Sequence, residues 1–419
     1  MSRSAPLVAA VHALVAAHPQ AMRVDTLRAE LSGRVACRAA RTDQSSKRSP
    51  RRPSRLRSYA AELDVVTVDL TGGSTPAAEQ LRVWLNFGEH GRELVSTEAA
   101  IATLRLLALG PDGAAAVAGG GSEEAAALKR TIFKVVPLEN AAGRAKVEAG
   151  ELCLRTNGRG VDPNRNWATH WGFKEKDYDP YEEAAGAHPF SEPEAALLRD
   201  AVAAWRPHAW VNIHSGMRAM FMPFDHIAAK AGGAAGAAHE AVLAALKARH
   251  CGDCETGSGG ATVGYLAHGT ATDYVFSNLS VPIAMTWEIY GDTAADRADC
   301  FRMFNPLGRD ELRSVVDAWA AACATLPSLL HHHADVPRSG GGGGGGGGEG
   351  HASSQPRKAG GLGLRGAAGA SEAAPAAVRR AVLMCALAAL ALGAWGVARR
   401  VARRRGAAAA GAPRPRPPP

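Results

Sequence analysis

The stretch LRVWLNFGEHGRELVSTEAA, residues 81–100, joins an apolar run to a cluster of ionisable side chains. The run LRVWLNF is typical of a buried strand, and the alanine-rich part that follows is typical of a helix. Between them stand Glu89, His90 and Glu93, at a strand end where such groups lose solvation unless they find a partner. His90 and Glu93 are three residues apart, so a helical segment would turn both toward one point. We therefore expect their partner to come from elsewhere in the fold.

The alternation of apolar runs with alanine- and leucine-rich segments continues along the chain. Five segments have the pattern of strands: ELDVVTVDL (62–70), LRVWLNF (81–87), TIFKVVPLE (131–139), AWVNIHS (209–215) and VPIAMTWEIY (281–290). Four segments have the pattern of helices: 96–109, 192–205, 238–250 and 310–330. Strands that alternate with helices indicate an α/β fold in which helices cover a sheet.

The best source of a third ligand is the segment WVNIHSG, where His214 ends a strand pattern and small residues follow. Two histidines and one carboxylate are the protein ligands of a class of catalytic zinc sites whose fourth position stays open to water. The spacing HxxE alone is common by chance, and a surface histidine near a helix start is the alternative for His90. The context of the other polar segments favours the metal site.

Two other segments carry polar side chains that a structural core does not need. The segment CLRTNGRGVDPNRNW, residues 153–167, places Arg155, Asn164 and Arg165 among glycine and aspartate. Such neutral and charged donors suit a carboxylate, and a solvated loop is the alternative.

The segment PIAMTWEIYG places Glu288 within an apolar strand. Burial raises the pKa of such a carboxyl group toward the range of a general base.

These motifs, in this order, resemble those of the zinc metallocarboxypeptidases related to pancreatic carboxypeptidase A. The resemblance covers residues 59–330 and rests on HxxE, the arginine-rich block, the IHS strand end and the late glutamate. It implies a single α/β domain with a central mixed, largely parallel eight-stranded sheet flanked by helices. It also implies one zinc ion (Zn²⁺) per chain and hydrolysis of the C-terminal peptide bond of peptides or proteins.

The resemblance implies a role for individual residues of the catalytic centre. The zinc ligands would be His90, Glu93 and His214. Glu288 matches the general base that activates the zinc-bound water, and Arg155 matches the arginine that stabilises the oxyanion together with zinc. Asp162 matches the acid that orients the first zinc histidine.

The resemblance also implies substrate contacts. Asn164 and Arg165 match the pair that binds the free C-terminal carboxylate, and Tyr265 matches the tyrosine that closes over the terminal residue. Arg92 matches a contact one residue further from the C-terminus. Thr272 stands where relatives of the pancreatic basic-specific type carry an acid, which favours an apolar or neutral terminal residue, although relatives also place pocket acids elsewhere. The motifs are most similar to those of a plant and green-algal branch of the family.

The charge of the chain is unevenly distributed. The 419 residues carry a formal net charge of +8, and the sequence pI is about 9.3. Residues 34–57 carry +8 and residues 379–419 carry +9, which leaves −9 for the rest. Basic segments of this kind are commonly solvated or face membranes. The acidic remainder argues against nucleic acid as a partner, and the sequence does not indicate the oligomeric state.

Composition and the resemblance together predict six parts. The resemblance implies the zinc carboxypeptidase domain (59–330) and the assignment of an N-terminal helix and the start of the catalytic domain to residues 1–33. Composition predicts the others: a basic disordered insertion (34–58), a Gly/Ala-rich linker (331–378), a transmembrane helix with flanking arginines (379–400) and a basic Pro-rich tail (401–419). Residues 381–398 are uncharged. At about 1.5 Å per residue they would cross about 27 Å, close to the hydrocarbon thickness of a bilayer.

The orientation of this expected membrane span follows from its flanking charges. Arginines cluster after Ala398, which places the short tail in the cytoplasm and the catalytic domain in the lumen or outside the cell. The Ala/Val-rich N-terminus contains His12 and His18 and is followed by no convincing signal-peptide cleavage site. A tail-anchored protein with a cytosolic catalytic domain is therefore the alternative.

The seven cysteines give no clean disulfide framework. Disulfides among Cys153, Cys251, Cys254 and Cys300 are one possibility, and free buried thiols are the other. Two alternatives to a carboxypeptidase also stay open. One is an amidase or deglutamylase that uses the same metal site, and the other is a non-catalytic, membrane-tethered binding module.

Overall fold

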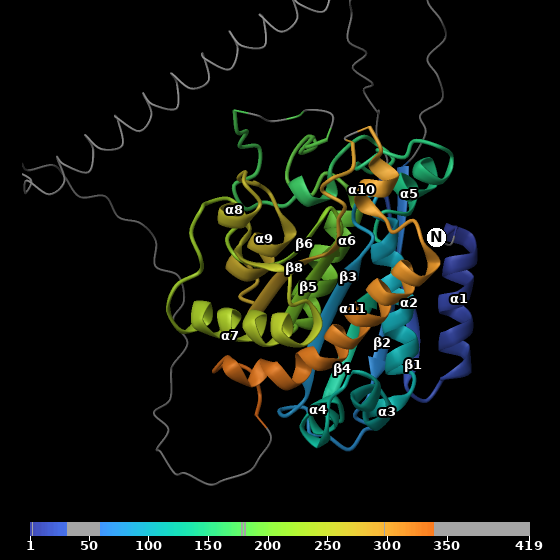
Figure 1. Cartoon of the computed structure of the whole chain (residues 1–419), viewed down its shortest axis with the longest axis vertical. Coiled ribbons are helices and arrows are strands. Elements are labelled where there is room, and N and C mark those ends of the chain that lie inside the picture. The colour runs from blue at the N-terminus through green and yellow to red at the C-terminus, as the bar shows by residue number, and fades with distance from the viewer. Residues whose placement is uncertain (2, 32–58, 177–178, 180–181, 297, 339–419) are drawn as a thin grey trace, which may run out of the picture. The chain divides into compact units, whose positions relative to one another are not determined.

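The computed structural model describes residues 1, 3–31, 59–176, 179, 182–296 and 298–338. Within them, eight strands form one sheet with the order β1-β2-β4-β3-β5-β8-β6-β7 (Figure 1). The strands are β1 (Met22–Leu31), β2 (Tyr59–Asp69), β3 (Leu81–Phe87), β4 (Thr131–Val136), β5 (Ala209–His214), β6 (Met217–Met222), β7 (Glu255–Ser258) and β8 (Ile283–Tyr290). The expected eight-stranded sheet is confirmed.

The sheet is mixed. Strands β4, β3, β5 and β8 lie side by side and are parallel. At one edge β1 and β2 are added in antiparallel pairing. At the other edge β6 is antiparallel to β8 and parallel to β7. The four central parallel strands all have their carboxyl ends at the same edge of the sheet, which is where open α/β sheets bind ligands.

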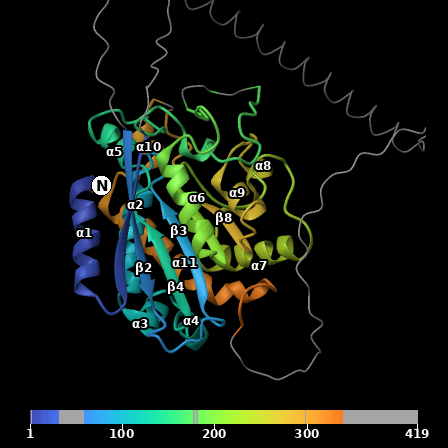
Figure 2. The same cartoon turned by 180° about the vertical axis from the view of Figure 1, so that it is seen from behind.

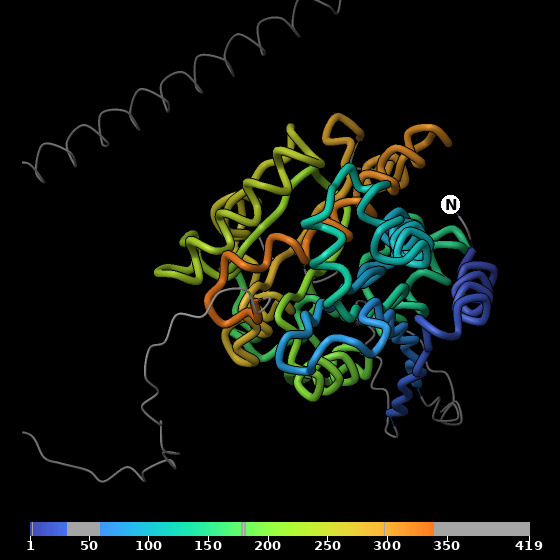
Figure 3. Tube along the Cα trace, turned by 90° about the horizontal axis from the view of Figure 1, so that it is seen from below, coloured from blue at the N-terminus to red at the C-terminus, as the bar shows by residue number. Residues whose placement is uncertain are grey.

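Helices cover both faces of the sheet. On one face lie α2 (Leu94–Leu107), α7 (Gly233–His250) and α11 (Arg309–Leu329), and on the other lie α6 (Pro193–Trp205) and α9 (Ala271–Ser277) (Figure 2). Helix α1 (Ser4–Ala17) packs beside α2 at the β1 end (Figure 3). The shorter helices are α3 (Gly110–Val117), α4 (Ser122–Leu128), α5 (Ala141–Glu148), α8 (Gly259–Thr262) and α10 (Cys300–Phe304).

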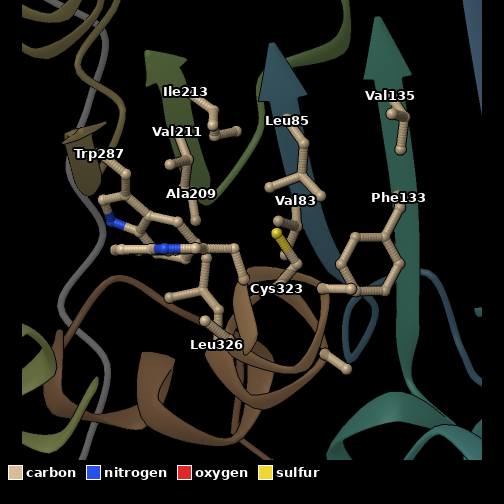
Figure 4. Packing of buried hydrophobic residues seen from close by; sticks show 14 of the residues in the cluster. Val83, Leu85, Phe133, Val135, Ala209, Val211, Ile213, Trp287, Cys323 and Leu326 are labelled. Atoms are coloured by element: carbon tan, nitrogen blue, oxygen red, sulfur yellow. The ribbon is translucent and has the colours of Figure 1, made fainter. Parts of the chain in front are cut away.

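The apolar runs recognised in the sequence are strands buried on both faces. In β3, Val83 and Leu85 belong to the core under α2 and α11, whereas Trp84 belongs to the core under α6. Figure 4 shows Cys323 and Leu326 of α11 packed against the side chains of three parallel strands. Because both faces are covered, the runs are almost continuously apolar instead of alternating with polar residues.

Two glycines turn the chain from β3 into the site. Gly88 has a φ of +71°, which side chains other than glycine rarely adopt, and it directly follows the strand. A Cβ atom on Gly91 would lie 2.9 Å from the backbone of Gly143 and 2.9 Å from the carbonyl oxygen of Leu154. The backbone of residues 88–93 is therefore held tightly between neighbouring segments, with His90 and Glu93 fixed at the end of β3.

Four of the cysteines form two disulfides. Cys153 pairs with Cys300, and Cys251 pairs with Cys254, whereas Cys323 is a buried free thiol. In the part of the chain that the structure describes, none of the helices has the length and apolar character needed to cross a bilayer. The expected span at 379–400 and the expected insertion at 34–58 lie outside the described residues.

Candidate active site

Three buried side chains converge at the carboxyl ends of β3 and β5. Nδ1 of His90 lies 2.6 Å from Oε1 of Glu93, and Nδ1 of His214 lies 3.0 Å from Oε2 of the same carboxylate. The two Nδ1 atoms are 3.1 Å apart. His90 and Glu93 come from the turn between β3 and α2, and His214 ends β5. Residues far apart in sequence thus place three ligand atoms around one point.

The three side chains fit a zinc ion. Two imidazole nitrogens at hydrogen-bond distance repel through their lone pairs unless a proton or a cation lies between them. Burial alone would raise the pKa of Glu93, but His90 and His214 outweigh it and lower this pKa below its ordinary value. Two imidazoles and an ionised carboxylate are the donor set of catalytic zinc sites that keep a fourth position open.

A second carboxylate, Glu89, also lies near both histidines, with possible ligand atoms of all three residues within 4.8 Å of one another. Its Oε2 atom is 3.1 Å from Nε2 of His214, the ring nitrogen that does not point at Glu93. The short contacts of Glu93 with both Nδ1 atoms make Glu93 the better third ligand. Glu89 then lies behind His214, on the far side of its ring.

Asp162 connects the metal ligands to the arginines. Its Oδ1 is 3.1 Å from Nε2 of His90, and its Oδ2 accepts a hydrogen bond of 2.7 Å from Nε of Arg155. Burial would raise the pKa of Asp162, but Arg155 and His90 hold it well below its usual range. An ionised Asp162 therefore fixes the orientation of His90 and Arg155 together.

Glu288 lies beside His214, in register with it across the parallel pair β5 and β8. Its Oε2 is buried and has no hydrogen-bond partner among the described residues. Burial and the nearby Glu93 raise the pKa of Glu288 to about 7. A carboxyl group with this pKa can take up and release a proton near neutral pH.

A cavity of about 670 Å³ opens beside this cluster. Its walls include Glu288 and the three predicted arginines, and Tyr265, which is 40% exposed, lies on its rim. Those arginines are Arg92, Arg155 and Arg165. The cavity thus combines a carboxyl group near the metal ligands with several guanidinium groups, which suits a ligand that carries an anionic end.

Two of these arginines already hold glutamates of one loop. Nη2 of Arg165 donates to Oε1 of Glu183 at 2.7 Å, and Nε donates to the same oxygen at 3.2 Å. Arg92 donates to both oxygens of Glu182, at 2.6 and 3.0 Å. The predicted partner of Arg165, Asn164, accepts from the backbone N–H of Ala271 at 2.8 Å.

A buried acid, Asp225, contacts the helix that carries Thr272 but does not line the cavity: its backbone N–H donates to the carboxylate of Asp273. Thr272 is buried, and its hydroxyl lies 2.7 Å from that of Thr286. Asp225 is also buried, and its carbonyl oxygen accepts from the N–H of Ala267 in the Tyr265 loop. Burial and the adjacent Asp273 raise the pKa of Asp225 to about 7, and Arg165 is close enough to oppose that shift.

Comparison with known proteins agrees with this geometry. Residues 9–317 match the family model described as zinc carboxypeptidase. The chain belongs to the zinc carboxypeptidase family. Members of this family use one zinc ion, which agrees with the cluster of His90, His214 and an acidic ligand.

Individual relatives are distant. Carboxypeptidase A4 of Mus musculus is 26% identical over 228 residues, which is 49% of this chain and 50% of that protein, so the chain spans about half the length of this relative. Carboxypeptidase A from Helicoverpa armigera superposes with a TM-score of 0.59 at 16% identity, covering 79% of this chain and 74% of that one. Bovine thrombin-activatable fibrinolysis inhibitor, in complex with tick carboxypeptidase inhibitor, gives 0.56 at 16% identity, covering 79% and 97%. At such identities these structures show the carboxypeptidase fold alone.

The structure brings His90, Glu93 and His214 together and places Arg92, Arg155, Arg165, Tyr265 and Glu288 on the cavity wall, whereas Asn164 does not line the cavity. Sequence reasoning missed several partners of these residues. Glu182 and Glu183 stand in a polar stretch with no motif, and Asp225 lies in a segment that differs from the pancreatic pattern. The pair of adjacent glutamates that follows the arginine-rich block was the available signal for the loop contacts. For Asp225 the only signal was an acid directly after the apolar run MFMPF.

Removing one histidine tests the metal site. We expect His214→Ala to lose the one equivalent of zinc that wild type retains after dialysis, because two ligands do not replace a three-ligand set. His12→Ala is the matched control, since His12 is 45% exposed and pairs with Asp64 far along the chain. Elemental analysis gives the stoichiometry. A full equivalent of zinc in His214→Ala would contradict the assignment of this ligand.

Proposed function

We propose that this chain is a zinc-dependent metallocarboxypeptidase that removes the terminal residue from the C-terminus of peptides or proteins. The observation that carries the proposal is the convergence of His90, Glu93 and His214 beside an arginine-lined cavity. Family membership supports the same chemistry. The metal ligands, the carboxyl group of Glu288 and the arginines supply the three components that hydrolysis at a chain end requires.

Zinc, when held by His90, Glu93 and His214, supplies Lewis-acid polarisation of a water molecule and of the scissile carbonyl. Glu288 accepts the proton of the attacking water at its carboxylate and returns it to the leaving amine. Arg155, held by Asp162, places its positive charge on the cavity wall, where negative charge develops on the carbonyl oxygen.

The enzyme would act only at chain ends because its substrate needs a free terminal carboxylate to bind. Arg165 offers a charged fork and Asn164 a neutral amide next to it, and together they suit the terminal carboxylate of a peptide. Tyr265 lines the cavity and is 40% exposed, and we expect it to cover the terminal residue. An interior peptide bond has no carboxylate to satisfy Arg165, so it is bound less well in the reactive position.

Peptides with free and amidated C-termini test this function. The enzyme should release one residue at a time from the free acid, detected by mass spectrometry, and leave the amidated peptide intact. In Glu288→Gln we expect kcat to fall by about 10²- to 10⁴-fold while zinc remains bound, because the proton acceptor is lost.

The acid limb of the wild-type pH profile gives a second measurement of the role of Glu288. A carboxylate must be ionised to act as a base, so activity falls as the pH drops through its pKa. A bound cation lowers that pKa, so the limb should lie at or below about pH 7, the metal-free value of Glu288. Hydrolysis of the amidated peptide at a comparable rate, or full activity of Glu288→Gln, would refute the proposal.

Glu183 accepts hydrogen bonds from Arg165, the arginine that would bind the terminal carboxylate of the substrate. We propose that the terminal carboxylate displaces Glu183 from Arg165, because one guanidinium edge cannot serve both anions. The Glu183 side chain is 22% exposed and can move away into solvent. Glu183→Gln should therefore lower KM about two- to tenfold with little change in kcat, in keeping with the modest free energy of such pairs.

An exposed glutamate in an ion pair provides the control for this effect. Glu62 pairs with Arg28 on β1 and β2, remote from the cavity, and Glu62→Gln should leave KM unchanged. Steady-state kinetics with one free-acid peptide compares the two variants with wild type. An unchanged or higher KM in Glu183→Gln would show that Glu183 does not compete with substrate.

We propose a preference for a basic terminal residue, in contrast to the apolar or neutral residue that Thr272 alone favours. The support is Asp225, which does not line the cavity but contacts Asp273, the neighbour of Thr272, and is close enough to Arg165 to feel its charge. Its pKa of about 7 means that the carboxyl group is neutral in acid and charged in base. The ratio of kcat/KM for C-terminal lysine over leucine should therefore rise with pH through about 7. Asp225→Asn should flatten this rise, whereas the exposed Asp253→Asn should keep it. A flat wild-type ratio would exclude Asp225 from specificity.

The same acid bears on the two alternative functions. A terminal glutamate side chain would meet the charge of Asp225, which disfavours a deglutamylase; γ-linked and α-linked glutamate peptides separate the two activities. A non-catalytic binding module would retain zinc without turnover, which the free-acid peptides detect.

We further propose that the catalytic domain lies in the lumen or outside the cell, anchored by residues 379–400. The two disulfides support an oxidising compartment, and the uncharged run 381–398 supports the anchor. The tail-anchored form with a cytosolic domain is the alternative. Digestion of the catalytic domain in intact vesicles, with lumenal markers preserved, would exclude the lumenal form.

The plant and green-algal branch that the motifs resemble is not among the relatives described above.

A further inference from the structure

Glu89 is a buried acid of the opening stretch that the proposed mechanism does not use. It precedes His90, is only 1% exposed and does not line the cavity. An acidic side chain at such a position is costly unless polar partners surround it. Its surroundings therefore indicate its role.

Glu89 lies behind the ligand His214. Its Oε2 is 3.1 Å from Nε2 of His214 and accepts a hydrogen bond of 2.7 Å from Nδ2 of Asn212. The N–H bond at Nε2 of His214 does not point directly at Oε2 of Glu89, so Nε2 has no well-aligned hydrogen-bond partner among the described residues. Oε1 of Glu89 has no partner among them either. Buried polar groups are almost always hydrogen-bonded, and the Glu89 carboxylate is the acceptor that lies 3.1 Å from Nε2 of His214.

A chain of amides holds Glu89 in place. Asn212 on β5 stands in register with Asn86 on β3, and its Oδ1 accepts from Nδ2 of Asn86 at 2.9 Å. Nδ2 of Asn86 also donates to Oε2 of Glu139 at 2.6 Å. Glu139 follows β4, so the carboxyl ends of three adjacent parallel strands supply this buried row.

The row ends in two carboxyl groups whose neighbours differ. Burial and the nearby charge of Glu89 raise the pKa of Glu139 well above its ordinary value, so Glu139 is the neutral member. Oε2 of Glu89 lies next to Nε2 of His214 and the amide of Asn212, whereas Glu139 contacts the amide of Asn86.

We propose that Glu89 is a positioning residue for the metal ligand His214: its carboxylate accepts Nε2–H, fixes that tautomer and directs the Nδ1 lone pair toward His90 and Glu93. The inference rests on the metal site of the proposed function. With Asp162 behind His90 and Glu89 behind His214, each histidine ligand has a carboxylate on its second nitrogen. Such partners orient the ring and raise its basicity as a ligand.

Two isosteric variants of the row test the proposal. Glu89→Gln removes the charge at His214, and zinc affinity should fall about 10- to 100-fold, as for other partners of metal-bound histidine. Glu139→Gln makes the same chemical change at the neutral end of the row, so zinc affinity should stay within about threefold of wild type. Competition with a chelator measures both dissociation constants, and thermal unfolding of the metal-free proteins reports whether each variant folds.

A third variant covers the case in which Glu89→Gln does not fold. Asn212→Ala leaves the carboxylate but removes the amide that holds it, and zinc affinity should fall at least threefold. The imidazole ¹⁵N shifts of zinc-loaded wild type should show a protonated Nε2 on His214.

A zinc affinity equal to that of wild type in Glu89→Gln would overturn the proposal. If Glu89→Gln is unfolded, the same result in Asn212→Ala would overturn it. An equal loss in Glu89→Gln and Glu139→Gln would also overturn it. Wild type that binds no zinc would instead refute the metal site.

Discussion

The meeting of His90 and His214 with Glu93 depends on the parallel register of β3 and β5. Asn86 pairs with Asn212 near the two strand ends, so the residues that follow them emerge at the same edge of the sheet. The next strand, β8, brings Glu288 level with His214. A shift of one residue in either pairing would turn a ligand or the base to the opposite face. The apolar packing of α11 and α6 on the two sheet faces thus fixes the site through register.

Carboxyl groups close together have different roles because their surroundings differ. Asp162 touches an arginine and a histidine, and its pKa lies well below the ordinary range. Glu288 is buried with Glu93 nearby, and its pKa is raised to about 7. A carboxyl group beside cations, such as Asp162, therefore keeps its negative charge, whereas one buried near another acid, such as Glu288, can exchange a proton. Acid–base catalysis requires both kinds of group. Glu89 differs from both in position, because it lies behind the ligand His214 and does not line the cavity.

The five strands β2, β3, β4, β5 and β8 and the cluster of polar residues that follows β3 were predictable because local sequence patterns indicate them, whereas the sequence analysis did not name β6 and β7. The apolar runs require two covered faces, and HxxE after such a run places two ligands at a strand end. Glu183, Asp225 and Glu139 were not predictable in this way. Their roles depend on which distant side chain each meets, and no spacing within their own segments encodes Arg165, Asp273 or Asn86 as neighbours. Thr272 illustrates the same limit, because attention to one pocket position overlooked the acid on a neighbouring segment.

X-ray absorption at the zinc edge, on protein loaded with one equivalent of zinc, tests the assignment of His90, Glu93 and His214 as the zinc ligands. We expect two imidazole nitrogens at about 2.0–2.1 Å and carboxylate oxygen at about 2.0–2.2 Å. One imidazole contribution should disappear in His90→Ala, and the carboxylate contribution should disappear in Glu93→Gln but persist in Glu89→Gln. A spectrum with sulfur ligands, or one in which Glu89→Gln removes the carboxylate and Glu93→Gln does not, would contradict it.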